Sequence, residues 1–334
     1  MSLSTRALPP SFEVFDNSFY NITGSTPKLS VLLENNDFPF AHEASVYTPS
    51  TNELFMTSNM FTDPITKKTT IKISKVSLDS NPVTSQIINT TVPLGNGGIN
   101  YKDGILWCGQ GTMNETGGLF QMSIEPPYTS ELLVGNFYGR QFTSINDVVV
   151  HSDGSFWFTD PIYGYVQGVR PKPQLPSQVY RFDPKTNNTR VVADGFDRPN
   201  GISFSPDEKI VYITDTGATI GDGSKDPTKP ATIYAYDLTT SHGSTFLTNR
   251  RVFAMADTGI PDGIKTDMQG NVYAGCGDGI NVWSAGGILL GKILVDNGAA
   301  NFGFGKGGQL YIMNENKVYF AQLDSSVKGS ILKI

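Results

Sequence analysis

Residues 146–160 read NDVVVHSDGSFWFTD, which is a polar residue, a short apolar run, a tight polar turn and a second apolar run with aromatic side chains. The same phrase returns as NGISFSPDEKIVYITD at residues 200–215 and as DGIKTDMQGNVYAG at residues 262–275. Two apolar runs joined by a short polar turn are typical of a β-hairpin. A hairpin that recurs at intervals of tens of residues indicates a repeat architecture.

Six copies of the phrase can be aligned on the aromatic residue of the second run. Their first residues, each given with its aromatic residue, are Glu43 (Phe55), Asn96 (Trp107), Asn146 (Trp157), Asn200 (Tyr212), Asp262 (Tyr273) and Ala300 or Asn301 (Tyr311). The spacing of about 40 to 60 residues leaves room for four strands per copy. We therefore predict an all-β fold, a six-bladed β-propeller. A long β-sandwich or a β-solenoid is the alternative, although a solenoid would show shorter and more even repeats.

The domain organisation follows from where the repeats begin. They start at Glu43, and no later change in composition marks a second domain. We expect residues 39–334 to form a single propeller domain and residues 1–38 to form an N-terminal extension that wraps around it. Two polar inserts, at 163–176 and 216–230, would lie on one face as rims or lids of a central pocket.

Composition and charge exclude several classes of protein. The 334 residues include 35 Gly and 20 Pro, and only 17% are charged, which favours short strands and turns over helices. The net charge is −6 and no cluster of Lys and Arg stands out, so we expect no nucleic-acid partner. No apolar run approaches the length of a membrane span, so we expect no membrane partner. The oligomeric state is open between a monomer and a simple homo-oligomer.

Localisation rests on short signals. Residues 1–6 are followed by no apolar core, so we expect no signal peptide here. Four Asn-x-Ser/Thr triplets, at Asn21, Asn89, Asn114 and Asn187, nevertheless favour a mature secretory-pathway glycoprotein. A cytoplasmic protein is the alternative.

The first residues of the repeats form the candidate site. In a propeller the first strand of each blade lines the central channel, so the residues that open these strands meet at one end of it. Here they are Glu43, Asn96, Asn146, Asn200 and Asp262, all oxygen donors and all from different blades. Hard cations such as Ca²⁺ prefer such ligands, whereas the absence of His and Cys at these positions disfavours zinc and copper. Asn and Asp also cap turns, but turn capping does not explain a Glu.

The order of Glu43, Asn146, the pair Asn200-Gly201 and the triplet Pro261-Asp262-Gly263 resembles the gluconolactonase family, which includes the senescence-marker (regucalcin-like) lactonases. The stretches FAHEA (40–44), YGRQF (138–142), FTD (158–160), YGY (163–165) and YAGCGDG (273–279) resemble fungal lactonohydrolases, the aldonolactone and pantolactone hydrolases. The chain departs from the wider family in having Glu43-Ala44-Ser45 for Glu-Gly-Pro and Ser144 for a substrate-binding Arg. Arg140 could supply that charge from another direction.

The resemblance implies a lactonohydrolase, a carboxylic ester hydrolase that opens sugar-acid or related hydroxy-acid lactones. It implies one divalent cation in the channel, usually Ca²⁺, held by Glu43, Asn200 and Asp262, with Asn146 helping to hold metal or substrate. Mn²⁺, Mg²⁺ or Zn²⁺ could occupy the same oxygen site. We expect Asp262 to be the general base, with Glu43 as the second candidate. The residues expected to bind substrate are Asn96, Asn146, His42, Arg140, Tyr163 and Tyr165.

A second function of a different class is kept beside this one. A propeller without catalytic activity could bind a ligand or a partner protein on its top face, because one fold hosts many functions. The ring of oxygen donors distinguishes the two hypotheses, since a scaffold has no use for Glu43 and Asp262 at the axis.

Overall fold

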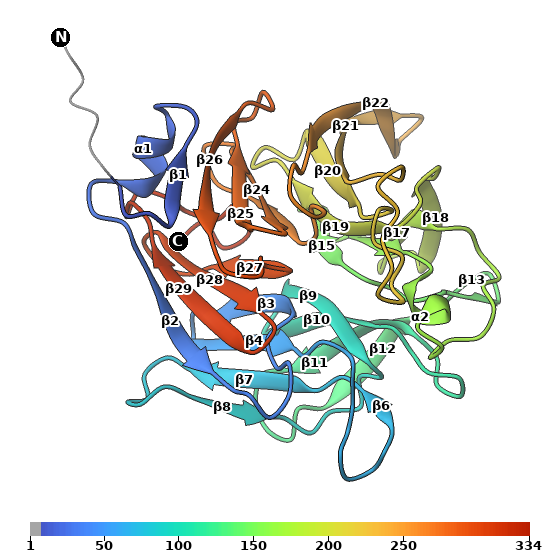
Figure 1. The fold of residues 1–334 in the computed structure, drawn as a ribbon. Helices are drawn as coiled ribbons and strands as arrows, with labels where there is room; N and C mark the ends of the chain where they lie inside the picture. Colours follow the sequence, from blue (N-terminus) through green and yellow to red (C-terminus); the bar gives the residue numbers. More distant parts are fainter. Residues whose placement is uncertain (1–7) are drawn as a thin grey trace.

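The computed structural model describes residues 8–334, which form six antiparallel sheets arranged around one axis (Figure 1). The prediction of a six-bladed β-propeller is confirmed. The first strands of the six sheets are β3 (Glu43–Thr48), β9 (Gly95–Tyr101), β15 (Val148–Val150), β19 (Pro199–Phe204), β23 (Ile264–Thr266) and β27 (Asn301–Phe304). These strands contact one another in chain order and β27 contacts β3, so they close a ring around the channel.

The second and third strands complete the middle of each sheet. The second strands are β4 (Glu53–Thr57), β10 (Gly104–Gly109), β16 (Phe156–Asp160), β20 (Ile210–Asp215), β24 (Val272–Cys276) and β28 (Gln309–Asn314). The third strands are β7 (Ile73–Ser77), β11 (Gly118–Ser123), β17 (Gln178–Asp183), β21 (Thr232–Ser241), β25 (Gly279–Trp283) and β29 (Lys317–Gln322). Each predicted hairpin is therefore the first two strands of one sheet.

The outermost strands show how the ring closes. In the first four sheets they are β8 (Thr84–Ile87), β12 (Ser130–Val134), β18 (Asn188–Ala193) and β22 (Ser244–Met255), and the fourth strand of the fifth sheet is β26 (Leu289–Leu294). The sixth sheet takes its outermost strand, β2 (Lys28–Glu34), from the N-terminal part of the chain, where it pairs with β29. The two ends of the propeller are thus joined within one sheet.

The rest of the N-terminal segment packs on the fifth sheet. Strand β1 (Phe12–Val14) pairs with β26 as a fifth strand, and α1 (Phe19–Thr23) follows it. Phe19 is fully buried, and a Cβ on Gly291 of β26 would lie 2.3 Å from its ring, so this glycine leaves the space that the ring fills. Residues 1–7 of the expected extension lie outside the described part of the chain.

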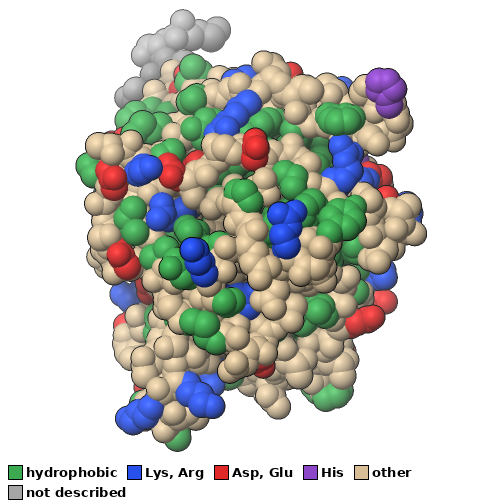
Figure 2. Space-filling view, turned by 90° about the vertical axis from the view of Figure 1, so that its right-hand side faces the viewer, with side chains coloured by type: hydrophobic (Ala, Val, Ile, Leu, Met, Phe, Trp, Pro, Cys, Tyr) green, Lys and Arg blue, Asp and Glu red, His purple; other side chains and the backbone are tan. Residues whose placement is uncertain are grey.

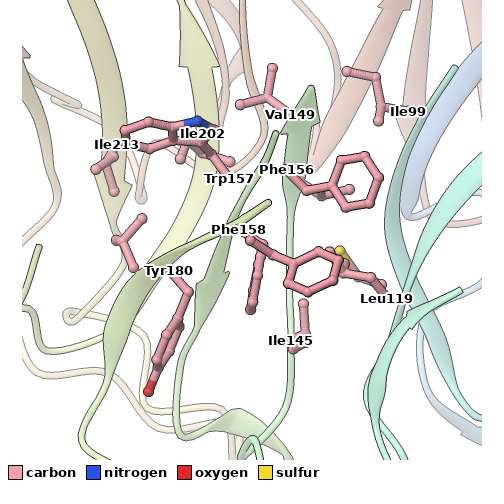
Figure 3. Close-up of a cluster of buried hydrophobic side chains, with 14 of the residues drawn as sticks. Ile99, Leu119, Ile145, Val149, Phe156, Trp157, Phe158, Tyr180, Ile202 and Ile213 are labelled. Atoms are coloured by element: carbon pink, nitrogen blue, oxygen red, sulfur yellow. The ribbon is translucent and has the colours of Figure 1, made fainter. Parts of the chain in front are cut away.

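The hydrophobic core lies between neighbouring sheets. All five residues of β16 are buried, because this strand has a sheet on each side, whereas the outermost strand β18 is mostly half-buried or exposed. Figure 3 shows Phe156, Trp157 and Phe158 between side chains of the sheets before and after, such as Leu119 and Ile213. Alternation of apolar and polar residues is therefore lost in the second strands.

The last features of the fold are its surface and its short elements. On the face shown in Figure 2, hydrophobic and charged side chains are interspersed. Within residues 8–334 no helix is long and apolar enough to cross a membrane. The remaining elements are the short α2 (Tyr163–Val166) and two small hairpins, β5 (Phe61–Thr62) with β6 (Thr69–Thr70) and β13 (Asn136–Phe137) with β14 (Arg140–Gln141).

Candidate functional site

One end of the channel opens into a cavity of about 270 Å³. Seven of the nine residues predicted for the site line it: His42, Glu43, Asn96, Asn146, Tyr163, Asn200 and Asp262. They come from five sheets and from the insert that follows β16. Both predicted inserts contribute to the lining, through Tyr163 and Gln167 of one and Thr219, Gly221 and Gly223 of the other. The inserts therefore form part of the rim, as expected.

Irregular backbone turns the oxygen donors toward the axis. The pairing of β3 with β4 shifts register between Glu43 and Val46, and Ala44 and Ser45 adopt left-handed φ values of 72° and 55°. The pairing of β19 with β20 shifts in the same way around Asn200. Such bulges bend a strand and redirect a side chain. Left-handed φ is uncommon for residues other than glycine, so the surrounding structure imposes this conformation next to Glu43.

The glycines that follow three of the donors are required by space. A Cβ on Gly97 would lie 2.6 Å from the backbone oxygen of Asn146, and one on Gly201 would lie 2.5 Å from that of Asp262. A Cβ on Gly263 would lie 2.4 Å from the side chain of Asn301. The first strands approach one another so closely at the axis that the residue after Asn96, Asn200 or Asp262 has no room for a side chain.

Four side-chain oxygens in the cavity have no hydrogen-bond partner within residues 8–334. They are the Oδ1 atoms of Asn96, Asn146, Asn200 and Asp262, and all four are buried. An unsatisfied buried acceptor costs about 1–3 kcal/mol, so a cluster of four points to a missing positive partner. An oxygen-binding divalent cation fits this donor set. Within the described residues no group of three or more His, Cys, Asp or Glu side chains is placed to hold a metal ion, so a cation here would depend on the amides.

The carboxylate of Glu43 is held from one side. Its Oε2 accepts a hydrogen bond of 2.6 Å from Nδ2 of Asn301, and its Oε1 lies 3.9 Å from Nε2 of His42. Nδ1 of His42 lies 2.7 Å from Oε1 of Glu315, whose Oε2 accepts from Nδ2 of Asn59. Burial opposes the charge on His42, but Glu315, Glu43 and Asp262 outweigh it and raise the pKa of the imidazole to about 10.

Asp262 is the second carboxylate of the cavity. Burial, followed by the neighbouring charge of Glu43, raises its pKa well above the ordinary value for Asp. Two carboxylates in one buried site repel each other in the ionised form. The charge of His42 offsets this repulsion in part, and a bound cation would relieve it further.

Hydrogen bonds of Tyr163 and Arg170 connect the loops around the cavity. The hydroxyl of Tyr163 lies 2.6 Å from Oγ1 of Thr216, which ties α2 to the second insert, and burial raises the pKa of this phenol. The guanidinium of Arg170 is 2% exposed and donates to the backbone oxygens of residues 112, 115, 142 and 143 and to Oε1 of Gln141. Arg170 thereby holds three loops beside the cavity together.

Two predicted substrate-binding residues are not brought to the cavity. Arg140 is exposed in the β13–β14 hairpin, and its guanidinium lies 5.3 Å from the centre of the Phe137 ring. Tyr165 is 44% exposed and does not line the cavity, although Tyr163 on the same short helix does. Conversely, sequence reasoning missed Gln110 and Gln167 in the lining, because isolated polar residues outside the repeated phrase give no signal.

Comparisons with known proteins identify the family. The family model described as "SMP-30/Gluconolactonase/LRE-like region" matches residues 112–316. The chain is 30% identical to lactonohydrolase oryL of Aspergillus oryzae, over 96% of this chain and 78% of that protein. It is 30% identical to a gluconolactonase of Zymomonas mobilis, over 68% of this chain and 62% of that protein.

Solved structures share the fold. A gluconolactonase from Xanthomonas campestris superposes with a TM-score of 0.74 at 24% identity, over 93% of this chain and 94% of that one. A protein described as the calcium-binding regucalcin of Agrobacterium tumefaciens superposes with a TM-score of 0.64 at 16% identity, over 90% and 94% of the two chains.

Proposed function

Since the chain belongs to the SMP-30/gluconolactonase/LRE-like family, we propose that it is a lactonase that uses a divalent cation. Its substrates are sugar-acid or related hydroxy-acid lactones, whose intramolecular ester it hydrolyses. The observation that carries the proposal is the cluster of four unpartnered oxygens, on Asn96, Asn146, Asn200 and Asp262, beside the Glu43 carboxylate in one cavity.

The cation-binding residues in this proposal are Glu43, Asn146, Asn200 and Asp262. Two carboxylates and two neutral amides would leave a bound divalent cation electrophilic. Such a cation, when bound, polarises the lactone carbonyl and stabilises the negative charge that develops on its oxygen. Calcium is the proposed ion because every donor is oxygen, and the regucalcin neighbour, described as calcium-binding, supports this choice.

Asp262 is the proposed general base. A carboxylate takes the proton from a water as that water attacks the carbonyl carbon, and the base must lie within hydrogen-bond reach of the water. Asp262 lines the cavity together with the other oxygen donors, which supports this role. Glu43 is the second candidate, although one of its oxygens is already engaged by Asn301.

Substrate hydroxyls would meet a polar and largely uncharged wall. Asn96, Asn146, His42 and Tyr163 are the proposed substrate-binding residues, and all four line the cavity. Apart from Glu43, Asp262 and His42, the lining residues are neutral. Amides and hydroxyls both donate and accept hydrogen bonds, which suits the alternating hydroxyl groups of a sugar lactone.

The test is acid release at constant pH from a panel of lactones. The panel holds gluconolactone, galactonolactone, pantolactone and a plain aliphatic lactone, each with and without a chelator. We expect turnover that chelation abolishes and Ca²⁺ restores, with Mn²⁺, Mg²⁺ and Zn²⁺ tried in parallel. Asp262→Asn should lack this turnover. Asp267→Asn is the matched control, because Asp267 is a buried carboxylate that bonds Tyr273 and Asn271 outside the cavity lining.

Two results would contradict the proposal. Turnover that survives complete removal of divalent cations would exclude the cation from the mechanism. Absence of turnover on every lactone, with the cation bound, would favour a propeller that binds a ligand or partner without catalysis.

We also propose that the protein is a secreted glycoprotein. The asparagines of all four Asn-x-Ser/Thr triplets are exposed. A shift in electrophoretic mobility on treatment with an endoglycosidase, for protein from its native source, would support this, and an unchanged mobility would contradict it.

A further inference from the structure

A buried chain of polar side chains runs from the fifth sheet to the cation ligand Glu43. Nζ of Lys265, on β23, donates to Oδ1 of Asn301 at 3.2 Å. Nδ2 of Asn301, at the start of β27, donates to Oε2 of Glu43 at 2.6 Å. The three residues are 9%, 1% and 3% exposed, so water does not compete for these contacts. Neither Lys265 nor Asn301 lines the cavity, and the proposed mechanism uses neither of them.

The orientation of the Asn301 amide is determined by its donors. Oδ1 accepts from Nζ of Lys265 and also from the backbone N–H of Phe302 at 2.8 Å. A flipped amide would place its NH₂ group against both donors, so Nδ2 must face Glu43. Lys265 therefore helps to decide which atom of Asn301 meets the Glu43 carboxylate.

The stability of the fold does not explain this lysine. Its ammonium is buried beside the ring of Phe302, at 5.6 Å from the ring centre, and the Asn301 oxygen is the one hydrogen-bond partner recorded for it in residues 8–334. A buried ammonium with so few partners is destabilising compared with an apolar side chain of similar size. Burial lowers the pKa of Lys265, and the charges of Asp147 and Glu43 offset this only in part.

The neighbouring backbone leaves room for this arrangement. A Cβ on Gly263 would lie between 2.4 and 2.6 Å from three side-chain atoms of Asn301. The glycine after Asp262 is thus needed so that the Asn301 amide can reach Glu43. Lys265 of the fifth sheet and Asn301 of the sixth sheet are thereby linked by hydrogen bonds to Glu43 of the first sheet.

We propose that Asn301 and Lys265 are positioning residues that hold Glu43 for cation binding. Asn301 engages Oε2 and leaves Oε1, on the side of His42, for the cation, while Lys265 holds the Asn301 amide in the orientation that this requires. The inference rests on the proposed function, because it takes Glu43 as a cation ligand. Neither residue contacts the substrate.

The direction in which removal of Lys265 changes cation affinity distinguishes a positioning role from a purely electrostatic one. The ammonium of Lys265 repels a cation, so its removal would tighten cation binding if it acted only through its charge. If Lys265 acts by holding Asn301, and through it Glu43, removal weakens cation binding. The two roles therefore predict opposite changes in the dissociation constant.

The experiment is calorimetric titration of Ca²⁺ into chelator-stripped full-length protein, with thermal unfolding in EDTA measured alongside. The variants are Asn301→Leu and Lys265→Met, and Asn301→Ser serves if the leucine variant does not fold. The matched controls are Asn281→Leu and Lys292→Met. Asn281, on the third strand β25, is a fully buried amide without hydrogen-bond partners among the described residues. Lys292 is a buried lysine that donates to Asp257 and Asp278.

We expect both variants to weaken Ca²⁺ binding, by about 10- to 100-fold for Asn301→Leu, the usual effect of removing a group that orients a metal ligand. The loss should be smaller for Lys265→Met, and the controls should bind as the unmodified protein does. Unchanged affinity in folded Asn301 variants would overturn the inference while the proposed function stands. Tighter binding by Lys265→Met would overturn the role of Lys265. Failure of the unmodified protein to bind Ca²⁺, Mn²⁺, Mg²⁺ or Zn²⁺ would overturn the proposed cation site and the inference with it.

Discussion

Replacement of Asn200 by leucine should have opposite consequences in the absence and in the presence of a cation. Oδ1 of Asn200 is buried and has no hydrogen-bond partner in the part of the chain that the structure describes. Such an acceptor destabilises a fold by about 1–3 kcal/mol, and leucine, of similar size, removes it. In EDTA we therefore expect Asn200→Leu to unfold at the same or a higher temperature than the unmodified protein.

With Ca²⁺ the expected order reverses. A ligand that binds only the folded state at about 100 times its Kd stabilises that state by about 2.7 kcal/mol. An unfolding entropy of about 2.1 cal/mol/K per residue gives about 0.7 kcal/mol/K for 334 residues, so the expected rise in Tm is about 4 °C. Asn200→Leu should lose most of this rise, because it removes one ligand of the cation.

The assay is thermal unfolding at two Ca²⁺ concentrations and in EDTA. Asn281→Leu is the control, because it removes a buried unpartnered amide on β25, away from the cavity, and should keep the full rise with Ca²⁺. The reasoning is refuted if Asn200→Leu is clearly less stable than the unmodified protein in EDTA and still gains the same rise with Ca²⁺. That result would mean that the amide serves the fold and not the cation.

Three further predictions concern buried groups around the site. Burial raises the pKa of Asp160 to about 7, so the folded state binds this proton more tightly than the unfolded state does. The resulting contribution to stability is complete below about pH 4 and is lost as the pH rises through 7. Asp160→Asn should therefore reduce the fall in Tm between about pH 5 and pH 8. Arg170→Met should lower the free energy of unfolding in urea by about 3–5 kcal/mol, because it leaves several buried backbone oxygens without their donor; a loss below 1 kcal/mol would contradict the role given to the guanidinium. Tyr163→Phe should raise KM for a lactone with little change in kcat and cost about 1 kcal/mol of stability, since it removes the contact with Thr216, and a selective fall in kcat would instead place the hydroxyl in the chemistry.

The repeated phrase was sufficient to predict the architecture. Alternating apolar runs and tight turns are local features, so residues 146–160 and their copies predict the hairpins without knowledge of distant contacts. Because every copy occupies an equivalent place in the ring, residues at the same position of the phrase arrive at the same end of the channel. This is why Glu43, Asn146, Asn200 and Asp262 could be grouped from the sequence and line one cavity.

Short motifs outside the phrase were less informative. Arg140 and Tyr165 belong to stretches that resemble relatives, but the β13–β14 hairpin and the turn of α2 leave both outside the cavity lining. No periodic pattern relates such inserts to the axis, so the direction of each side chain depends on the conformation of its own loop.

The sequence by itself determined six hairpins, their order and the oxygen donors that open them. The tertiary structure alone decided which distant side chains support those donors. Asn301 reaches Glu43 across 258 residues of chain, Glu315 reaches His42 across 273, and β2 completes the sixth sheet beside β29. Closing the ring creates each of these contacts, since it brings the two ends of the propeller together. A contact that depends on closure leaves no local pattern in the sequence, because neither partner needs a particular neighbour in the chain.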